Sequence, residues 1–290
     1  MILLSTFVSD VFFSQTNLSN LFRQVSGVGL VSMGLLLVIM VGGIDLSVGS
    51  VMSLGGVLLA LLTHQMPLGA ALTLTIGCGI ALGLTAGFLT TAGKIAPFIA
   101  TLALMTIARG VSFMVSDGSP VPLNSAAAPL LGFGDGYLLG VPYPVLFFLL
   151  ITGLVFVMLQ YNVIGRILIA IGSNEEAVRL AGINVNRYYW FVYAFSGAMA
   201  SLAGIITVAR TGIGSPVVGI GLELDAIAAV VVGGASLKGG RGSAINTLLG
   251  VIILGMIGNI MNLKDVPAYP QQIIKGVIII LAVLLQRFQK

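Results

Sequence analysis

The stretch VSMGLLLVIMVGGIDLSVGSVMSLGGVLLALLT, residues 31–63, carries a single charged side chain, Asp45. It consists of two apolar blocks joined by a few residues, and the rest of the chain repeats this pattern, with most of its charge in short loops. Apolar residues make up 58% of the chain and charged residues only 8%, whereas soluble globular proteins carry about a quarter charged residues. So few charges cannot keep a surface of this size in water. The sequence therefore predicts an all-α polytopic membrane protein, and its 39 glycines allow close approach of the helices.

Length and composition exclude several other classes of protein. At roughly 20 apolar residues per span, the chain has room for about ten helices and no soluble domain, so 1–290 is predicted to be one transmembrane domain. Its one cysteine, Cys78, excludes an internal disulfide and a cysteine-rich metal site. Its one histidine, His64, excludes a histidine cluster and is interpreted as a loop residue. The net charge of +4 fits basic residues in short cytoplasmic loops and not a nucleic-acid surface.

Breaks in the apolar pattern predict the helices. The apolar start, 1–13, is interrupted by polar residues and is too short to cross roughly 30 Å of hydrocarbon. It lacks the basic region and the cleavage site of a signal peptide, so we interpret it as a shortened first helix. The further helices are predicted at 17–41, 45–63, 67–93, 97–116, 141–161, 187–209, 220–236, 243–262 and 270–287.

The distribution of charge predicts the orientation. The longest loop, 117–140, holds Asp117 and Asp135 but neither Lys nor Arg. The loop 162–186 holds Arg166 and Arg179, with Arg187 at its edge, and the C-terminus holds Arg287 and Lys290. Because basic loops stay in the cytoplasm, 117–140 is placed outside and both termini inside, and an alternating path through the predicted helices agrees with this.

Two segments indicate an internal repeat. Gly43-Ile44-Asp45-Leu46-Ser47 and Gly221-Leu222-Glu223-Leu224-Asp225 align without a gap, and each is followed by a glycine pair in the same register. By the predicted topology the two segments run in opposite directions, so 187–287 would be an inverted copy of 17–116, with 141–161 as a spacer. Inverted repeats with glycine-interrupted helices are typical of transporters. The polar residues at these helix starts either cap the helix dipole or line the pathway; they are Asp45, Ser47, Glu223 and Asp225.

A short segment inside the loop 162–186 differs from the spans around it. Residues 174–182 mix charged and apolar side chains at helical spacing and stop at Gly182, which predicts a short amphipathic helix exposed to the cytoplasm. It could lie on lipid, but the adjacent Glu175 and Glu176 disfavour an anionic membrane, so a groove on a protein partner is the better target. The candidate contacts are Asn174, Glu175, Glu176, Ala177, Arg179, Leu180 and Gly182.

Four stretches occur in an order typical of one transport family. They are Gly42-Gly43-Ile44-Asp45-Leu46-Ser47-Val48-Gly49-Ser50, Pro97-Phe98-Ile99-Ala100-Thr101-Leu102, the segment 174–183, and 221–234 with its continuation Ser236-Leu237-Lys238-Gly239-Gly240. On these stretches the chain resembles permease subunits of bacterial ABC importers for monosaccharides, of the ribose, arabinose, galactose and xylose type. The ribose type is the most similar.

The resemblance implies a function, a fold and partners. It implies an inner-membrane permease that works as a homo- or heterodimer with a cytoplasmic ATPase and a periplasmic sugar-binding protein, without a cofactor or metal. The fold would be similar to that of the vitamin B12 importer permease, with ten helices and the path between two subunits. The segment 174–182 would be the coupling helix that docks into the ATPase. The chain begins inside the family's usual first helix.

Other function classes fit the residues less well. No Gly-x-x-x-x-Gly-Lys-[Ser/Thr] motif occurs, so the chain has no P-loop for ATP, and no cluster suggests a catalytic metal. A secondary transporter also fits inverted repeats, but ion coupling usually needs an ionisable residue deep inside a span. The acids here lie near predicted helix starts, and Arg109 lies towards an outer end. A facilitating channel fits less well still, and the sequence does not identify the sugar.

Overall fold

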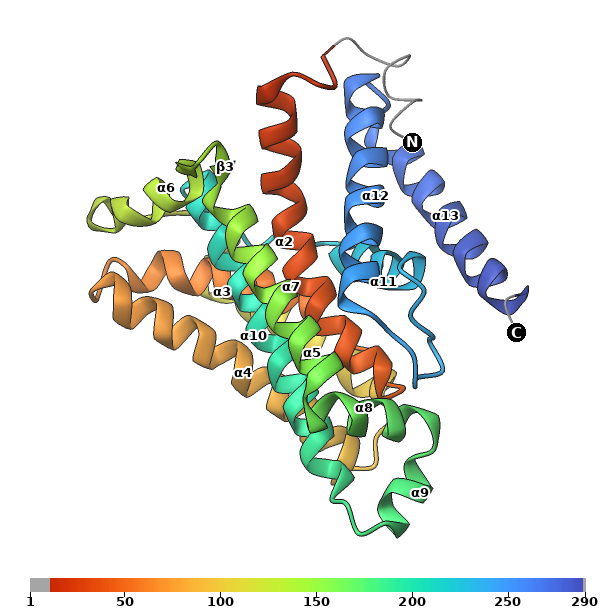
Figure 1. Ribbon diagram of the computed structural model, residues 1–290. Helices are drawn as coiled ribbons and strands as arrows, with labels where there is room; N and C mark the ends of the chain where they lie inside the picture. The colour runs from red at the N-terminus through yellow and green to blue at the C-terminus, as the bar shows by residue number, and fades with distance from the viewer. Residues whose placement is uncertain (1–10, 289–290) are drawn as a thin grey trace.

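The computed structural model describes residues 11–288 and is built almost wholly of helices (Figure 1). The predicted first helix, 1–13, lies mostly outside the described residues, and 11–13 form a turn that leads into the first long helix. The long helices are α2 (Gln15–Met40), α4 (Leu68–Thr91), α5 (Pro97–Val115), α7 (Tyr143–Tyr161), α10 (Val185–Thr211), α12 (Ala244–Leu263) and α13 (Ala268–Phe288). The shorter ones are α3 (Val48–Leu62), the 3-10 turn η1 (Ser125–Ala127), α6 (Ala128–Asp135), α8 (Val163–Ser173), α9 (Glu175–Leu180) and α11 (Leu222–Val232).

Every helix predicted after 1–13 is present, but two are shorter than predicted by four residues or more. Within residues 11–288, six helices are long and apolar enough to cross a membrane: α2, α4, α5, α7, α10 and α12. The predicted helix 45–63 begins only at Val48. The predicted helix 220–236 is the 11-residue α11, which at 1.5 Å per residue is about 16 Å long and does not cross the hydrocarbon alone.

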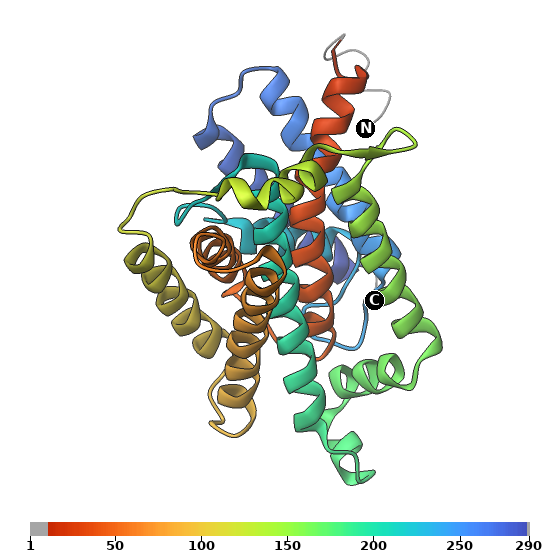
Figure 2. The ribbon, with the colours of Figure 1, turned by 90° about the vertical axis from the view of Figure 1, so that its left-hand side faces the viewer.

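The centre of the molecule is formed by α2 and α10. They lie side by side and run in opposite directions (Figures 1 and 2). α2 also packs against α11 and α12, and α10 packs against α3 and α4. Figure 2 views α3 almost end-on, so α3 crosses the long axes of the two central helices.

Glycines bring α4 unusually close to α10. Gly79 and Gly83 of α4 are one turn apart and both are buried. A Cβ atom at Gly79 would overlap the carbonyl oxygen of Gly197, and one at Gly83 would overlap that of Tyr193. The backbones of the two helices are therefore in contact, as small residues permit between membrane helices.

The predicted loop 117–140 contains ordered structure that the sequence analysis missed. Besides η1 and α6, it holds β1 (Val121–Pro122), which pairs antiparallel with β4 (Ile213–Gly214). It also leads into a hairpin of β2 (Tyr137–Leu138) and β3 (Val141–Pro142). These pieces are too short to show a periodic apolar pattern, because periodicity needs a window of about 11 residues or more.

The predicted loop 162–186 also contains a helix that was missed, α8. The Asn162 side chain caps α8 by accepting a hydrogen bond from the Ile164 backbone N–H at 3.1 Å. Gly165, Leu168 and Ile171 are its buried face, at the spacing of an amphipathic helix. Figure 1 shows α8 and α9 at one end of α10, with α6 and the hairpin at the other.

Candidate functional site

The short helix predicted at 174–182 is present as α9. The Asn174 side chain caps it by accepting a hydrogen bond from the Ala177 backbone N–H at 3.0 Å, which satisfies one of the free donors of a helix start. Gly182 follows the helix with φ +79°, a conformation that favours glycine. Val178 is buried, whereas Leu180 is 83% exposed, so α9 presents one large apolar side chain to the outside.

Two residues of the predicted contact set on α9, Glu175 and Arg179, are engaged by side chains of this chain. Arg179 pairs with Glu175 through Nη2 at 2.6 Å and Nε at 2.9 Å, the i,i+4 geometry that stabilises a helix. Arg179 Nη2 also donates to the Asn186 side chain at 3.1 Å. Glu175 and Arg179 therefore hold α9 against the start of α10. Glu176, Ala177 and Leu180 are exposed, and so is Arg179 although Glu175 and Asn186 hold its guanidinium.

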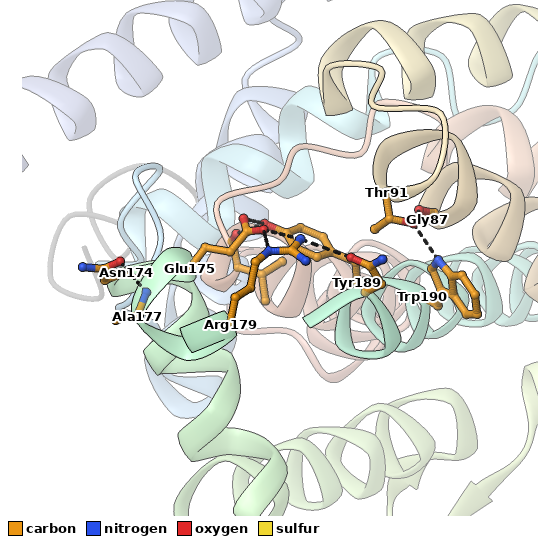
Figure 3. A network of polar contacts seen from close by, with 10 residues as sticks. Gly87, Thr91, Asn174, Glu175, Ala177, Arg179, Tyr189 and Trp190 are labelled. Atoms are coloured by element: carbon orange, nitrogen blue, oxygen red, sulfur yellow. Dashed lines mark hydrogen bonds and ion pairs between the residues drawn. The ribbon is translucent and has the colours of Figure 1, made fainter. Parts of the chain in front are cut away.

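Two aromatic residues at the start of α10 extend this network (Figure 3). The Tyr189 hydroxyl lies 3.0 Å from Glu175 Oε2 and 3.1 Å from the carbonyl oxygen of Val41, which ends α2. The Trp190 Nε1–H donates to the Thr91 hydroxyl at the end of α4 at 2.7 Å. The start of α10 therefore connects α9 with the ends of α2 and α4.

Asp45 lies in the break between α2 and α3 and is 1% exposed. Its Oδ1 accepts hydrogen bonds from the Ser47 backbone N–H at 2.9 Å and the Ser47 hydroxyl at 2.6 Å. Its Oδ2 accepts from the Ser196 hydroxyl of α10 at 2.7 Å. Asp45 and Ser47 therefore form a clamp between the break and α10, and a carboxylate with three donors is compensated for its burial.

The other two predicted acids, Glu223 and Asp225, do not lie in the same site as Asp45. Glu223 and Asp225 lie in the first turn of α11. Glu223 is half-buried beside α3: a Cβ atom at Gly49 would lie 2.5 Å from Glu223 Oε2. Asp225 pairs with Lys275 of α13 at 2.7 Å. Asp45 and Ser47 therefore act together, whereas Glu223 and Asp225 each make a separate contact, and the four residues do not form one site.

Several contact residues were missed by the sequence analysis. Arg109 of α5 donates through Nη1 to the carbonyl oxygens of Pro216 at 2.6 Å and Val218 at 2.7 Å. Tyr189, Ser196 and Lys275 were missed as well, because a single Tyr, Ser or Lys carries no recognisable motif. Among residues 11–288, no three His, Cys, Asp or Glu side chains gather as a metal site requires.

Removing the acceptor at Asp45 is expected to destabilise the protein. Asp45→Ala leaves three buried donors without their acceptor, and each unsatisfied group costs about 1–3 kcal/mol. Asp45→Asn keeps one acceptor oxygen and is expected to cost less. The midpoint of thermal unfolding in detergent should fall in the order wild type, Asn, Ala. Asp117→Asn, at an exposed position, is the control and should leave the midpoint unchanged; equal effects at the two sites would contradict a clamp at Asp45.

Comparison with known proteins gives a match over nearly the whole chain. Residues 17–283 match the family described as branched-chain amino acid transport system / permease component. The chain is 43% identical over 284 residues to the ribose import permease protein RbsC of Escherichia coli K12, covering 96% of this chain and 87% of that one. It is 38% identical over 291 residues to RbsC of Haemophilus influenzae, covering 99% and 90%. The L-arabinose transport system permease protein AraH of E. coli K12 is 36% identical over 280 residues, covering 94% and 83%. No solved structure gives a significant match.

Proposed function

We propose, on the premise that this chain belongs to the branched-chain amino acid transport system permease family, that it is the membrane subunit of an ATP-driven importer for ribose or a similar monosaccharide. The observation that carries this function is the 43% identity to a ribose import permease over 96% of the chain. The chain is a multi-pass inner-membrane protein and a transport subunit, not an enzyme. The secondary transporter is not favoured, because the chain is similar over nearly its whole length to import permeases for ribose.

ATP and sugar are supplied by partners. An ABC permease works with an ATPase and a periplasmic binding protein, and this chain has no P-loop of its own. We propose that a second permease copy, identical or related, completes the path. We orient the protein as the loop charges predict. The end of α10 beside α8 and α9 then faces the cytoplasm, and the end beside α6 faces outside. The C-terminus of the chain is placed in the cytoplasm.

An inverted repeat is supported by the order and packing of the helices. Four helices, α2 to α5, are followed after α6 to α9 by four others, α10 to α13. The first helix of each set packs against the second and third of the other: α2 on α11 and α12, and α10 on α3 and α4. The opposite directions of α2 and α10 (Figure 1) agree with an inversion. We therefore propose that 17–116 and 187–287 are inverted repeats. We also propose that the fold is similar to that of the vitamin B12 importer permease.

We assign the contact with the ATPase to α9. Its exposed side chains include one acid, Glu176, and one large apolar group, Leu180. A six-residue helix with two acids in its first turn is a poor ligand for a membrane surface, because interfacial helices bury a long apolar face and carry basic residues. A groove with an apolar floor and a basic rim fits α9 better.

Reconstitution tests the proposed function. Proteoliposomes that contain this protein alone are expected to show neither ATP hydrolysis nor accumulation of ribose. Adding the partner ATPase and the sugar-loaded binding protein should give ATP-dependent accumulation. Accumulation driven by a proton or sodium gradient, without the ATPase, would overturn the assignment and favour a secondary transporter.

A further inference from the structure

One face of α10 contacts successive residues of the break between α2 and α3. Tyr189, Tyr193 and Ser196 recur at spacings of four and three, which places them on one side of the helix. Tyr189 contacts the Val41 carbonyl and Ser196 contacts the Asp45 carboxylate. Between them, the Tyr193 hydroxyl lies against Gly43, where a Cβ atom would be only 2.7 Å away.

These contacts of α10 fix the residues between α2 and α3 in place, so that the break and α10 move together. Tyr193 is fully buried, and Gly42 adopts φ +81°, a conformation that favours glycine. A displacement of the start of α10 therefore acts directly on the junction from which α3 begins. α3 in turn packs against α4 and α5. A movement of the junction therefore also reaches these two helices through α3.

The Tyr189 hydroxyl is shared between two acceptors. Glu175 Oε2 and the Val41 carbonyl lie at nearly equal distances from it, 3.0 and 3.1 Å. A phenol carries one proton, whereas a carbonyl and a carboxylate paired with Arg179 only accept. A full hydrogen bond to one acceptor therefore weakens the bond to the other.

We propose that Tyr189 is a positioning residue that transmits the movement of α9 to the junction of α2 and α3, by exchanging its hydrogen bond between Glu175 and the Val41 carbonyl. The inference rests on the proposed function, in which α9 contacts the ATPase. When the ATPase displaces α9, Glu175 moves with it and the hydroxyl bonds Val41 alone. When α9 returns, the hydroxyl is shared again. The exchange gives two discrete hydrogen-bond arrangements, and an element with two such arrangements can couple distant sites when both of them bias it.

The test removes the hydroxyl and keeps the ring. Tyr189→Phe is reconstituted with the ATPase and the binding protein, and the ribose taken up per ATP hydrolysed is measured. Exchange of one hydrogen bond biases the two arrangements by roughly two- to tenfold, so this ratio is expected to fall by about that factor. Assembly with the ATPase should stay as in wild type, and the thermal midpoint should fall no further than the loss of one hydrogen bond explains. A merely structural tyrosine would lower the midpoint and leave the ratio unchanged.

Tyr188→Phe is the matched control. Its hydroxyl has no hydrogen bond in the described part of the chain, so the ratio should be unchanged. A cycle with Glu175→Ala adds a second readout: its effect should be non-additive with Tyr189→Phe and additive with Tyr188→Phe. An unchanged ratio in Tyr189→Phe, loss of assembly, or additivity in the first pair each overturns the proposal. Failure of the proposed function would look different, because wild-type protein would then show no ATPase-dependent uptake.

Discussion

Replacing Glu176 and Leu180 together, by Gln and Lys, is expected to detach the ATPase or to abolish uptake while the permease still folds. Leu180 is 83% exposed, so its replacement removes little buried surface. Placing a Lys in an apolar groove without a partner charge costs several kcal/mol, and each 1.4 kcal/mol lowers affinity about tenfold. Lys at the end of a helix suits the helix dipole, so α9 itself should persist. Co-purification with the ATPase, stimulated ATP hydrolysis and ribose uptake are the measurements.

A matched double variant at the other end of the molecule controls for these changes. Asp117→Asn with Leu131→Lys makes the same kinds of replacement in the loop 117–140, where Leu131 is also exposed. It should leave assembly with the ATPase intact and alter instead the response to the binding protein. If the α9 variant retains assembly, coupled hydrolysis and uptake, α9 is only an interfacial helix.

The long helices could be predicted because each carries its own signal. Pro97 at the first position of α5 and the apolar run that ends at Val115 fix that helix within a residue of its predicted bounds, 97–116. The start of α3 was predicted less well. Asp45 had been interpreted as the first residue of the helix, but its carboxylate bonds Ser47 and Ser196, and the helix begins three residues later.

The site could be predicted only in part. α9 was found because Asn174, the charged residues and Gly182 all lie within one local segment. The inward orientation of Glu175 was missed, because its partner Tyr189 belongs to the next helix. The contact of Tyr189 with Val41 joins residues 148 positions apart. Local periodicity carries no information on such a contact, which depends on how α10 packs against the end of α2.

Gly83→Val is expected to push α4 away from α10 and to destabilise the transmembrane bundle. A Cβ atom at Gly83 would overlap the carbonyl group of Tyr193, and backbone cannot rotate aside as a side chain can. α4 must then move away from α10, which loses the contacts of Gly79 and Gly87 one turn to either side. Overpacking in a core costs about 1–3 kcal/mol and occasionally more, and a clash with backbone lies at the upper end of that range.

Gly77→Val provides the control on the same helix. Gly77 is exposed and a Cβ atom there meets nothing within 4 Å, while the cost of a β-branched residue in place of Gly within a helix is the same at both sites. The difference between the two thermal midpoints therefore measures the α4–α10 contact alone. Because α10 also holds Val41 and Asp45, Gly83→Val should lower both the amount of folded protein in the membrane and the uptake of ribose per folded molecule. Equal midpoints for the two variants would mean that α4 and α10 do not approach as closely as their glycines allow.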